Sequence, residues 1–310
     1  MNNSCHNCKS KNIRFIYKTT DYISNEEFRI QRCANCDLIF PLEYPEDINK
    51  YYPKKYRSYI PIVKKIITIK SQLYVRSIIK RYSKNSNTIK NKVIEIGCGN
   101  GDMLKIFKNL GWDVYGSERS GVVDKNNELN ISNKEVDEYP NEYFDLALLY
   151  NSFEHLYDPG EILKKITTKV KKNGLIIISV PSHESFQCKF GKQDWVHLDA
   201  PRHLNIFSIK AFKHMMQSIV NTAVLEIVSH KSVSFDLEFY GWFQTILNKF
   251  YKENNLFLKY LQDMSGNKIK FYTSLLQLVI LSVPCAILSG LSMISNKGAI
   301  TEIILKKRSD

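Results

Sequence analysis

The sequence predicts an α/β fold in which a mainly parallel sheet is covered by helices on both faces. Apolar, strand-like runs alternate with helix-like segments through the middle of the chain, which is the pattern of β–α–β units. One run, 93–96, passes through a glycine-rich turn into a helix, and a long uncharged C-terminal segment ends in a last strand-like run. With 310 residues, of which 44% are hydrophobic, the chain can build one large core with appended segments.

Seven strands are expected in this core. They lie near 93–96, 112–117, 130–136, 145–150, 174–180, 223–229 and 299–306, and the strand near 130–136 has the weakest signal. Asp158-Pro159 supplies an N-cap and a first-turn proline for a helix that we expect to end at Asn173-Gly174. Ser208 caps a second helix in the same way.

The glycine-rich turn is the most informative stretch of the chain. Gly97, Gly99 and Gly101 allow backbone angles closed to other residues and leave the main chain open to a ligand. Glu118 ends the next strand-like run 21 residues beyond Gly97, where a carboxylate can accept hydrogen bonds from ribose hydroxyls. The third glycine follows the second by two residues rather than three, which disfavours a dinucleotide. Glu95, just before the turn, suits a ligand that carries an ammonium and a sulfonium group.

This pattern resembles the first motif of class I S-adenosylmethionine-dependent methyltransferases, and 144–156 resembles the fourth strand and following loop of that family. The resemblance covers most of 93–235. It implies a Rossmann-like, seven-stranded methyltransferase sheet with S-adenosylmethionine as cofactor. The cofactor-binding residues that it implies are Glu95, Gly97, Cys98, Gly99, Gly101, Glu118 and Asn151. A glycine turn in another kind of α/β protein is the alternative.

Two Cys-x-x-Cys knuckles at the start of the chain predict a metal site. Cys5, Cys8, Cys33 and Cys36 supply the four thiolates that form the closed tetrahedral shell of structural Zn²⁺. Because no coordination position stays open, we assign this site no chemistry. A pair of disulfides is the alternative, which a reducing cytosol disfavours.

The knuckles, together with 36–40 and the Tyr51-Tyr52-Pro53 turn, resemble a bacterial methyltransferase subgroup with an N-terminal zinc ribbon. Members are often associated with making sugars and envelope glycans, so the resemblance implies a small-molecule or lipid-linked acceptor, with a sugar as the first choice. We expect a zinc ribbon at 1–47, a basic helical linker or lid at 48–92, the methyltransferase core at 93–235, a hydrophobic helical insertion at 236–298, and a final strand with a tail at 299–310.

Positive charge is concentrated in the N-terminal third. The net charge is +13, and 13 Lys or Arg but no acidic residue lie between Ile48 and Ile94, which favours nucleic acid or an anionic membrane as a partner. Residues 60–82 have the periodicity of a basic amphipathic helix. Its expected apolar face is Ile62, Val63, Ile66, Ile67, Leu73, Tyr74 and Ile78. A lid over the cofactor, a membrane-surface helix and an ordinary solvated helix are the alternatives.

A hydrophobic segment precedes the last strand. The 26 residues between Lys270 and Lys297 carry no charge, which is long enough to span a bilayer. A single crossing would leave the last strand on the wrong side, and Pro284 and Gly290 interrupt the run. We therefore expect one or two hydrophobic helices in a hairpin. Packing on the core or over the substrate, contact with one leaflet, and true spanning are the alternatives. The polar start without a signal peptide predicts a cytoplasmic protein, with peripheral contact with the inner face of the membrane as the alternative.

Catalytic groups are expected beyond the C-terminal ends of the strands, the usual place in open α/β sheets. Glu154-His155 resembles a pair in ubiquinone-type O-methyltransferases, where an additional upstream acid helps to hold a divalent metal. The upstream position here is Asn151, which weakens the case for a metal-assisted mechanism, so we assign no second metal. For His155, capping or packing of its own loop is the alternative.

A second loop, 194–207, contains two His, two Asp, an Arg and a Trp, and resembles a His-Leu-Asp-x-Pro-Arg-His signature of the ribbon-bearing subgroup. Methyl transfer to a hydroxyl needs a base, and imidazole titrates near neutral pH. We predict His197 or His203 as the base, Asp199 as its orienting carboxylate and Arg202 as a clamp on an anionic substrate, with Trp195 as a wall. A structural hydrogen-bond network and a His/Asp/His metal site are the alternatives.

Two other functions compete with this interpretation. In an RNA or DNA methyltransferase, the ribbon and the basic stretch would form the nucleic-acid track. The residues after the fourth strand, 151–154, lack the Asn-Pro-Pro-Tyr signature of base methylation, so nucleic acid is the less favoured partner. A non-catalytic module that binds the cofactor without turnover is the second competitor.

Overall fold

The computed structural model describes residues 4–52, 59–83, 91–118, 129–132, 135–219, 224–252, 255–262 and 268–309. Parts of the predicted segments lie outside these residues: 1–3 in the ribbon, 53–58 (with Pro53) and 84–90 in the basic linker, 133–134 in the third strand, 223 at the start of the sixth, 253–254 and 263–267 in the hydrophobic insertion, and 310 in the tail.

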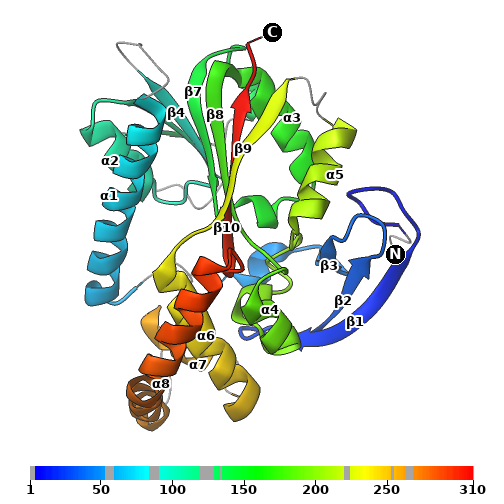
Figure 1. Cartoon of the computed structure of the whole chain (residues 1–310), viewed down its shortest axis with the longest axis vertical. Helices are drawn as coiled ribbons and strands as arrows, with labels where there is room; N and C mark the ends of the chain where they lie inside the picture. The colour runs from blue at the N-terminus through cyan, green and yellow to red at the C-terminus, as the bar shows by residue number, and fades with distance from the viewer. Residues whose placement is uncertain are drawn as a thin grey trace.

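A seven-stranded sheet forms the core (Figure 1). Its order is β6 (Asn130–Ser132), β5 (Asp113–Ser117), β4 (Lys92–Ile96), β7 (Phe144–Tyr150), β8 (Val170–Pro181), β10 (Ile300–Lys307) and β9 (Leu225–Ser232). The first five strands pair in parallel, whereas β10 runs antiparallel to both β8 and β9. The predicted Rossmann-like methyltransferase sheet is therefore confirmed, the weak third strand included.

Helices cover both faces of this sheet, as the alternating pattern predicts (Figure 1). The helices concerned are α1 (Pro61–Ser83) and α2 (Asp102–Asn109) on one face, and α3 (Pro159–Lys169) and α5 (Ile209–Ile219) on the other. Side chains such as Ile78 and Phe107 pack on the first face, and Leu163 and Phe212 pack on the second. The cores on the two faces hold the central strands in place and fix where their C-terminal ends lie.

The two predicted helix starts are confirmed, but one predicted end is wrong. The Asp158 carboxylate accepts from the Glu161 backbone N–H at 2.9 Å, and the Ser208 hydroxyl caps α5. Helix α3, however, ends at Lys169 rather than at Asn173-Gly174. Val170 already pairs with a residue of β7, so the Asn-Gly signal marks an irregular start of β8 instead of a helix end.

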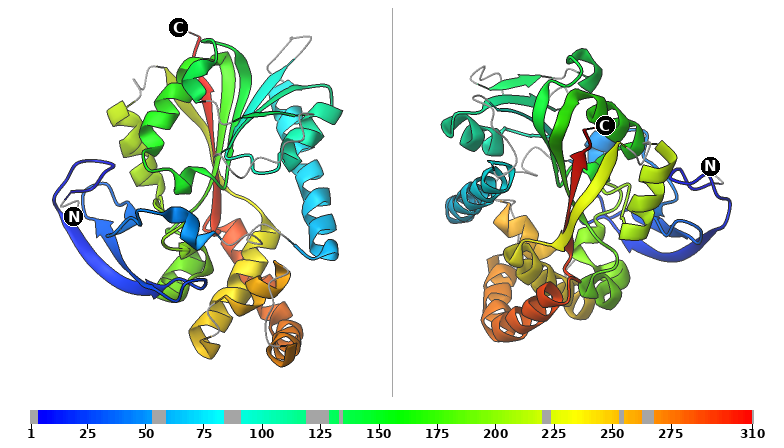
Figure 2. Two further views of the ribbon diagram at one scale, coloured as in Figure 1. Left: turned by 180° about the vertical axis from the view of Figure 1, so that it is seen from behind. Right: turned by 45° about the horizontal axis from the view of Figure 1, so that its top comes forward.

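The ribbon is a three-stranded antiparallel sheet of β1 (Ile13–Thr20), β2 (Glu27–Cys33) and β3 (Ile39–Pro41). The hairpin of the first two strands is as predicted, and β3 is an addition. Figure 2 shows the ribbon extending from the side of the core that carries α5. Main-chain hydrogen bonds between Ile39 and Ile206 join it to the loop that precedes α5.

The C-terminal insertion contains α6 (Phe235–Ile246), a π-helical turn η6 (Leu247–Tyr251), α7 (Leu256–Leu261) and α8 (Lys268–Ile294). The expected interruption at Pro284 and Gly290 is wrong, because α8 continues through both as one helix of 27 residues. Proline removes one backbone hydrogen bond. Cys285, next to it, is fully buried against the helices of the insertion, which favours keeping the helix continuous.

Shorter helical elements complete the chain. They are α4 (Phe186–Gly191) and the 3-10 turns η1 (Ile48–Tyr51), η2 (Val136–Glu138), η3 (Phe153–His155), η4 (Lys192–Asp194) and η5 (Val196–Leu198).

Helix α1 is present at its predicted position, but most of its predicted apolar face is not buried. Ile78 is buried, whereas Ile62, Ile66 and Leu73 are each more than half exposed. The C-terminal half of the helix packs with α2 on the sheet, and the N-terminal half extends beyond the core. The periodicity identified the helix but not what lies against it.

Candidate functional site

The glycine-rich turn connects β4 to α2, and its backbone accepts only glycine. Gly97, Gly99 and Gly101 have φ angles of +73°, +54° and +70°. A Cβ atom on Gly97 would lie 2.6 Å from the Cβ of Ser152, and one on Gly101 would lie 2.6 Å from Leu129. The turn thus presents bare main chain toward the space above the sheet.

A cavity of about 770 Å³ lies beside this turn. Five of the predicted cofactor-binding residues line it: Glu95, Gly97, Cys98, Gly99 and Asn151. On its other side it is lined by α1, through residues that include Ile67, Thr68 and Gln72. The size suits a nucleoside-like ligand, and the position of α1 supports its interpretation as a lid.

The polar groups around the cavity fit a ligand that carries a positive charge and can donate a hydrogen bond to a side-chain amide. Glu95 is buried at the end of β4, and the side-chain oxygen of Asn151 is buried with no hydrogen-bond partner among the described residues. Glu118 accepts from the Gly99 backbone N–H at 2.7 Å, which ties the end of β5 to the turn. Its contact with a ribose stays a prediction, as does the role of Gly101.

Two histidines from separate loops meet beyond the end of β7. The rings of His155 and His203 lie 4.7 Å apart between centroids. Nδ1 of His155 is 2.8 Å from the Arg202 carbonyl oxygen, and Nδ1 of His203 is 2.8 Å from the His197 carbonyl oxygen. Because a carbonyl oxygen can only accept, each Nδ1 carries the proton and each Nε2 keeps a lone pair. In each ring the nitrogen that can act as a base is therefore Nε2.

Two carboxylates face His203. Its Nε2 lies 3.8 Å from an oxygen of Glu154 and 3.8 Å from an oxygen of Asp199. Burial lowers the pKa of His203, and the charge of Asp199 opposes this effect, so the imidazole is neutral at pH 7. Glu154, His155 and His203 also place their ligand atoms within 4.8 Å of one another, which is a donor set for a divalent cation.

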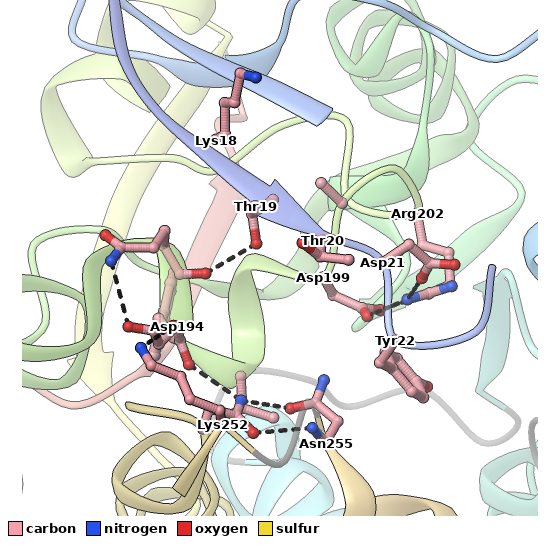
Figure 3. Close-up of a pocket in the computed structure, with 15 residues that line it drawn as sticks. Lys18, Thr19, Thr20, Asp21, Tyr22, Asp194, Asp199, Arg202, Lys252 and Asn255 are labelled. Atoms are coloured by element: carbon pink, nitrogen blue, oxygen red, sulfur yellow. Dashed lines mark hydrogen bonds and ion pairs between the residues drawn. The ribbon is translucent and has the colours of Figure 1, made fainter. Parts of the chain in front are cut away.

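Arg202 is held by contacts within the protein. Its guanidinium is fully buried and bonds both oxygens of Asp199, at 3.0 and 2.7 Å (Figure 3). It also contacts Asp21 of the ribbon at 2.6 Å and donates to the Tyr51 carbonyl at 2.9 Å. Burial would raise the pKa of Asp199, but Arg202 holds it below its usual value. Arg202 thus ties the ribbon and the linker to the histidine loop, and its contact with a substrate stays a prediction.

The side chain of His197 lies apart from the His155–His203 pair. Its carbonyl bonds His203, but its imidazole packs beside Trp195 and near Gly241 of α6. Burial lowers the pKa of His197 to about 4. Of the two bases that the sequence proposed, the geometry favours His203.

The buried imidazole of His197 predicts a pH-dependent stability. Below about pH 6.5 the unfolded chain protonates His197, whereas the folded imidazole stays neutral until about pH 4. The unfolded state then binds more protons, so the free energy of unfolding falls as the pH drops through this window, by up to about 1.4 kcal/mol per pH unit. Urea denaturation at several pH values measures this slope. His197→Gln should reduce it, and an unchanged slope would contradict the burial argument.

A second, smaller cavity of about 260 Å³ lies between the ribbon, the histidine loop and the C-terminal helices (Figure 3). Its lining is largely polar and includes Asp194, Lys252 and Asn255. The Tyr22 hydroxyl and the Trp195 indole N–H, from two further lining residues, are buried without a hydrogen-bond partner among the described residues. Of the residues predicted as a substrate site, Trp195, Asp199 and Arg202 line this cavity, whereas the contributions of the ribbon and of the C-terminal helices were not predicted.

The four ribbon cysteines converge as the knuckle spacing predicts. Their sulfur atoms all lie within 4.8 Å of one another, with Cys5 and Cys36 at 3.6 Å and Cys8 and Cys33 at 3.4 Å. All four are free thiols in this structure, at distances too long for disulfides. Four sulfurs around Zn²⁺ with bonds of about 2.3 Å would lie about 3.8 Å apart, so the cluster fits zinc.

Comparisons with known proteins agree with this geometry. Residues 69–219 match the family model of a methyltransferase domain. The chain is 30% identical over 98 residues to a ubiquinone biosynthesis O-methyltransferase of Bradyrhizobium diazoefficiens, and 28% identical over 100 residues to one of Rhodopseudomonas palustris. Each match covers 28% of this chain and 39% of the relative, so the chain spans well under half the length of these curated relatives.

Solved structures of methyltransferases align with this chain at low sequence identity. A putative sarcosine dimethylglycine methyltransferase from Galdieria sulphuraria has a TM-score of 0.49 at 11% identity, over 77% of this chain and 86% of that one. The plantazolicin methyltransferase BpumL in complex with SAH has a TM-score of 0.48 at 14% identity, over 79% and 87%. Residues 69–219, which contain the parallel strands of the sheet, are thus similar to a methyltransferase domain.

Proposed function

We propose that the chain, built around its methyltransferase domain, transfers a methyl group from S-adenosylmethionine to a hydroxyl of a small-molecule or lipid-linked acceptor. A sugar of cell-envelope glycan synthesis is the favoured acceptor, and the cytoplasm is the proposed compartment. The proposal rests on one observation above all: a glycine cradle and its cavity lie at the C-terminal ends of the strands, and the His155–His203 pair lies beyond the end of β7 at the same edge of the sheet.

The cavity residues would hold the cofactor by complementary charge and shape. S-adenosylmethionine supplies a methyl group activated by a sulfonium. The bare backbone at Gly97 and Gly99 gives close approach, and Glu95 and Asn151 offer oxygens to cationic parts of the ligand. Helix α1 lines the cavity on its outer side, where it would limit the access of water to a bound cofactor.

The second cavity supports a polyhydroxylated acceptor. Its lining combines carboxylates and amides with the Tyr22 hydroxyl and the Trp195 indole N–H, which have no partner in the described part of the chain. Such groups hydrogen-bond sugar hydroxyls. The Asp199–Arg202 pair forms part of its wall and is continuous with the loop that carries His203. An acceptor in this cavity would therefore lie beside the segment that carries the proposed base.

His203 is the proposed general base, with Glu154 and Asp199 stabilising its protonated form after it accepts the proton of the acceptor hydroxyl. Transfer of radioactive methyl from labelled S-adenosylmethionine to sugar and lipid fractions of a bacterial extract tests the activity. We expect His203→Gln to lower kcat at least about a hundredfold while the affinity for S-adenosylhomocysteine stays unchanged.

His197→Gln is the matched control, because its imidazole lies away from the pair, and it should retain most of the activity. Equal losses in both variants would point to a loop-packing role for His203. Cofactor binding without methyl transfer to any fraction would instead favour the non-catalytic module.

Nucleic acid is the competing acceptor class, and one observation favours it: Lys64, Lys65 and Arg76 are exposed on α1. A filter-binding titration with RNA at two salt concentrations decides this point. Tight, strongly salt-dependent binding together with methyl transfer to RNA would replace the sugar proposal.

A further inference from the structure

Helix α8 carries an apolar surface that no other described part of the chain covers. Its segment Phe271–Ile294 is, among the described residues, the one helix long and apolar enough to cross a membrane, and only 17% of that segment is buried. One side of the helix packs on α6 and α7, through contacts with residues such as Trp242 and Phe257. The other side forms an outer stripe of eight side chains, each more than half exposed: Tyr272, Leu276, Val279, Ile280, Val283, Ile287, Leu291 and Ile294.

The spacing of the outer stripe places it along one line of the helix. Successive members are mostly three or four residues apart, which is the repeat of one helical face. From Tyr272 to Ile294 the stripe is roughly 33 Å long. No charged residue lies between 271 and 296. Soluble monomers rarely expose a continuous apolar surface of this extent.

The stripe lies along the surface of the fold, which excludes a simple crossing of the bilayer. Helix α8 leads into β10, which lies inside the sheet between β8 and β9. Near this end, the Trp242 indole N–H of α6 donates to the Ser292 hydroxyl at 3.2 Å. The helix is therefore held on one side along the protein, and only its outer stripe is open to a hydrophobic medium.

Helix α1 carries a second exposed stripe with positive charge. Ile62, Ile66, Ile69 and Leu73 are half exposed or more, and Arg76 follows on the same helical line. The helix contains no acidic residue. It lies next to the insertion, since the Ile60 N–H, just before it, donates to the carbonyl at the end of α7, and Lys70 pairs with an aspartate of α6.

We propose that the outer stripe of α8 lies in the plane of an anionic lipid bilayer, with the basic side of α1 on the headgroups. Positive charge near an apolar stripe is complementary to anionic headgroups over acyl chains. A second copy of the chain, in contrast, would bring the same positive charge against it. Given the proposed function, this orientation lets α1, which lines the cofactor cavity, lie between the bilayer and the site that receives a lipid-linked acceptor.

Co-sedimentation of the full chain with vesicles tests this proposal. We expect binding to vesicles that contain phosphatidylglycerol and much weaker binding to phosphatidylcholine alone. Val279→Glu with Val283→Glu should weaken binding about tenfold per side chain. Val228→Glu is the matched control, because this valine is also exposed but lies on β9, and it should bind like the unchanged chain.

A second pair of substitutions tests the contribution of the positive charge on α1 to membrane binding. Lys65→Gln with Arg76→Gln should reduce binding to anionic vesicles about fivefold per charge. Calorimetry with S-adenosylhomocysteine on each variant monitors the fold and the cofactor site independently, so a failed docking proposal is distinguishable from a failed assignment of function. No vesicle binding, or a dimer in light scattering that Val279→Glu abolishes, would overturn the membrane proposal.

Discussion

Gly97→Ala is expected to abolish cofactor binding while leaving the fold intact. The new Cβ would lie 2.6 Å from the Cβ of Ser152, and the φ angle of +73° is itself unfavourable for alanine. The turn must then move away from the cavity that it lines. We expect the affinity for S-adenosylhomocysteine to fall at least about a hundredfold, as measured by calorimetry.

Gly111→Ala is the control that separates the two effects, because it introduces the backbone strain of a positive φ angle without a steric clash. Gly111 has a φ angle of +86°, but a Cβ there meets no atom within 4 Å. This variant should lose some thermal stability and keep its cofactor affinity. If Gly97→Ala binds as tightly as the unchanged chain, the turn is not the cofactor cradle, and the proposed function fails with it.

The second large effect concerns the ribbon cysteines. We expect one zinc ion per chain by elemental analysis and its loss in Cys36→Ser. Zinc in such sites contributes about 10 kcal/mol or more to folding, so the ribbon should unfold. Methyl transfer should fall with it, because Asp21 of the ribbon anchors Arg202 and thereby the histidine loop.

Cofactor binding provides the internal control for this experiment. The cavity at Gly97 is built without ribbon residues, so the affinity for S-adenosylhomocysteine should survive in Cys36→Ser. Cys285→Ser is the matched substitution, since this thiol is equally buried but lies in α8, away from the cluster. It should retain the zinc. A metal-free but stable and fully active chain would contradict the structural role.

Much of the fold could be predicted because its signals are local. The strand runs, the capping residues Asp158 and Ser208, and the glycine turn each depend on neighbours within a few residues. The errors occurred where distant contacts override these signals. Pro284 does not interrupt α8, because the helix is held against α6, and the Asn173-Gly174 turn signal lies inside a strand because Val170 already pairs with β7.

The candidate site shows the same division between features set by local sequence and features set by distant contacts. Gly97 and its neighbours line the cavity, as their local pattern led us to expect, but the approach of His203 to His155 depends on two loops about 50 residues apart. Arg202 shows the limit most clearly. Its residue type suggested a substrate clamp, whereas the carboxylate of Asp21, 181 positions earlier in the chain, satisfies its charge in the interior.

The sequence by itself determined the sheet, the glycine turn and the four-cysteine set, because backbone geometry and ligand spacing are encoded over short distances. Only the tertiary structure decided which two histidines lie together, that Arg202 forms an internal ion pair and which face of α8 stays open. Those properties depend on desolvation and on partner charges, and both arise only when segments far apart in the chain pack together.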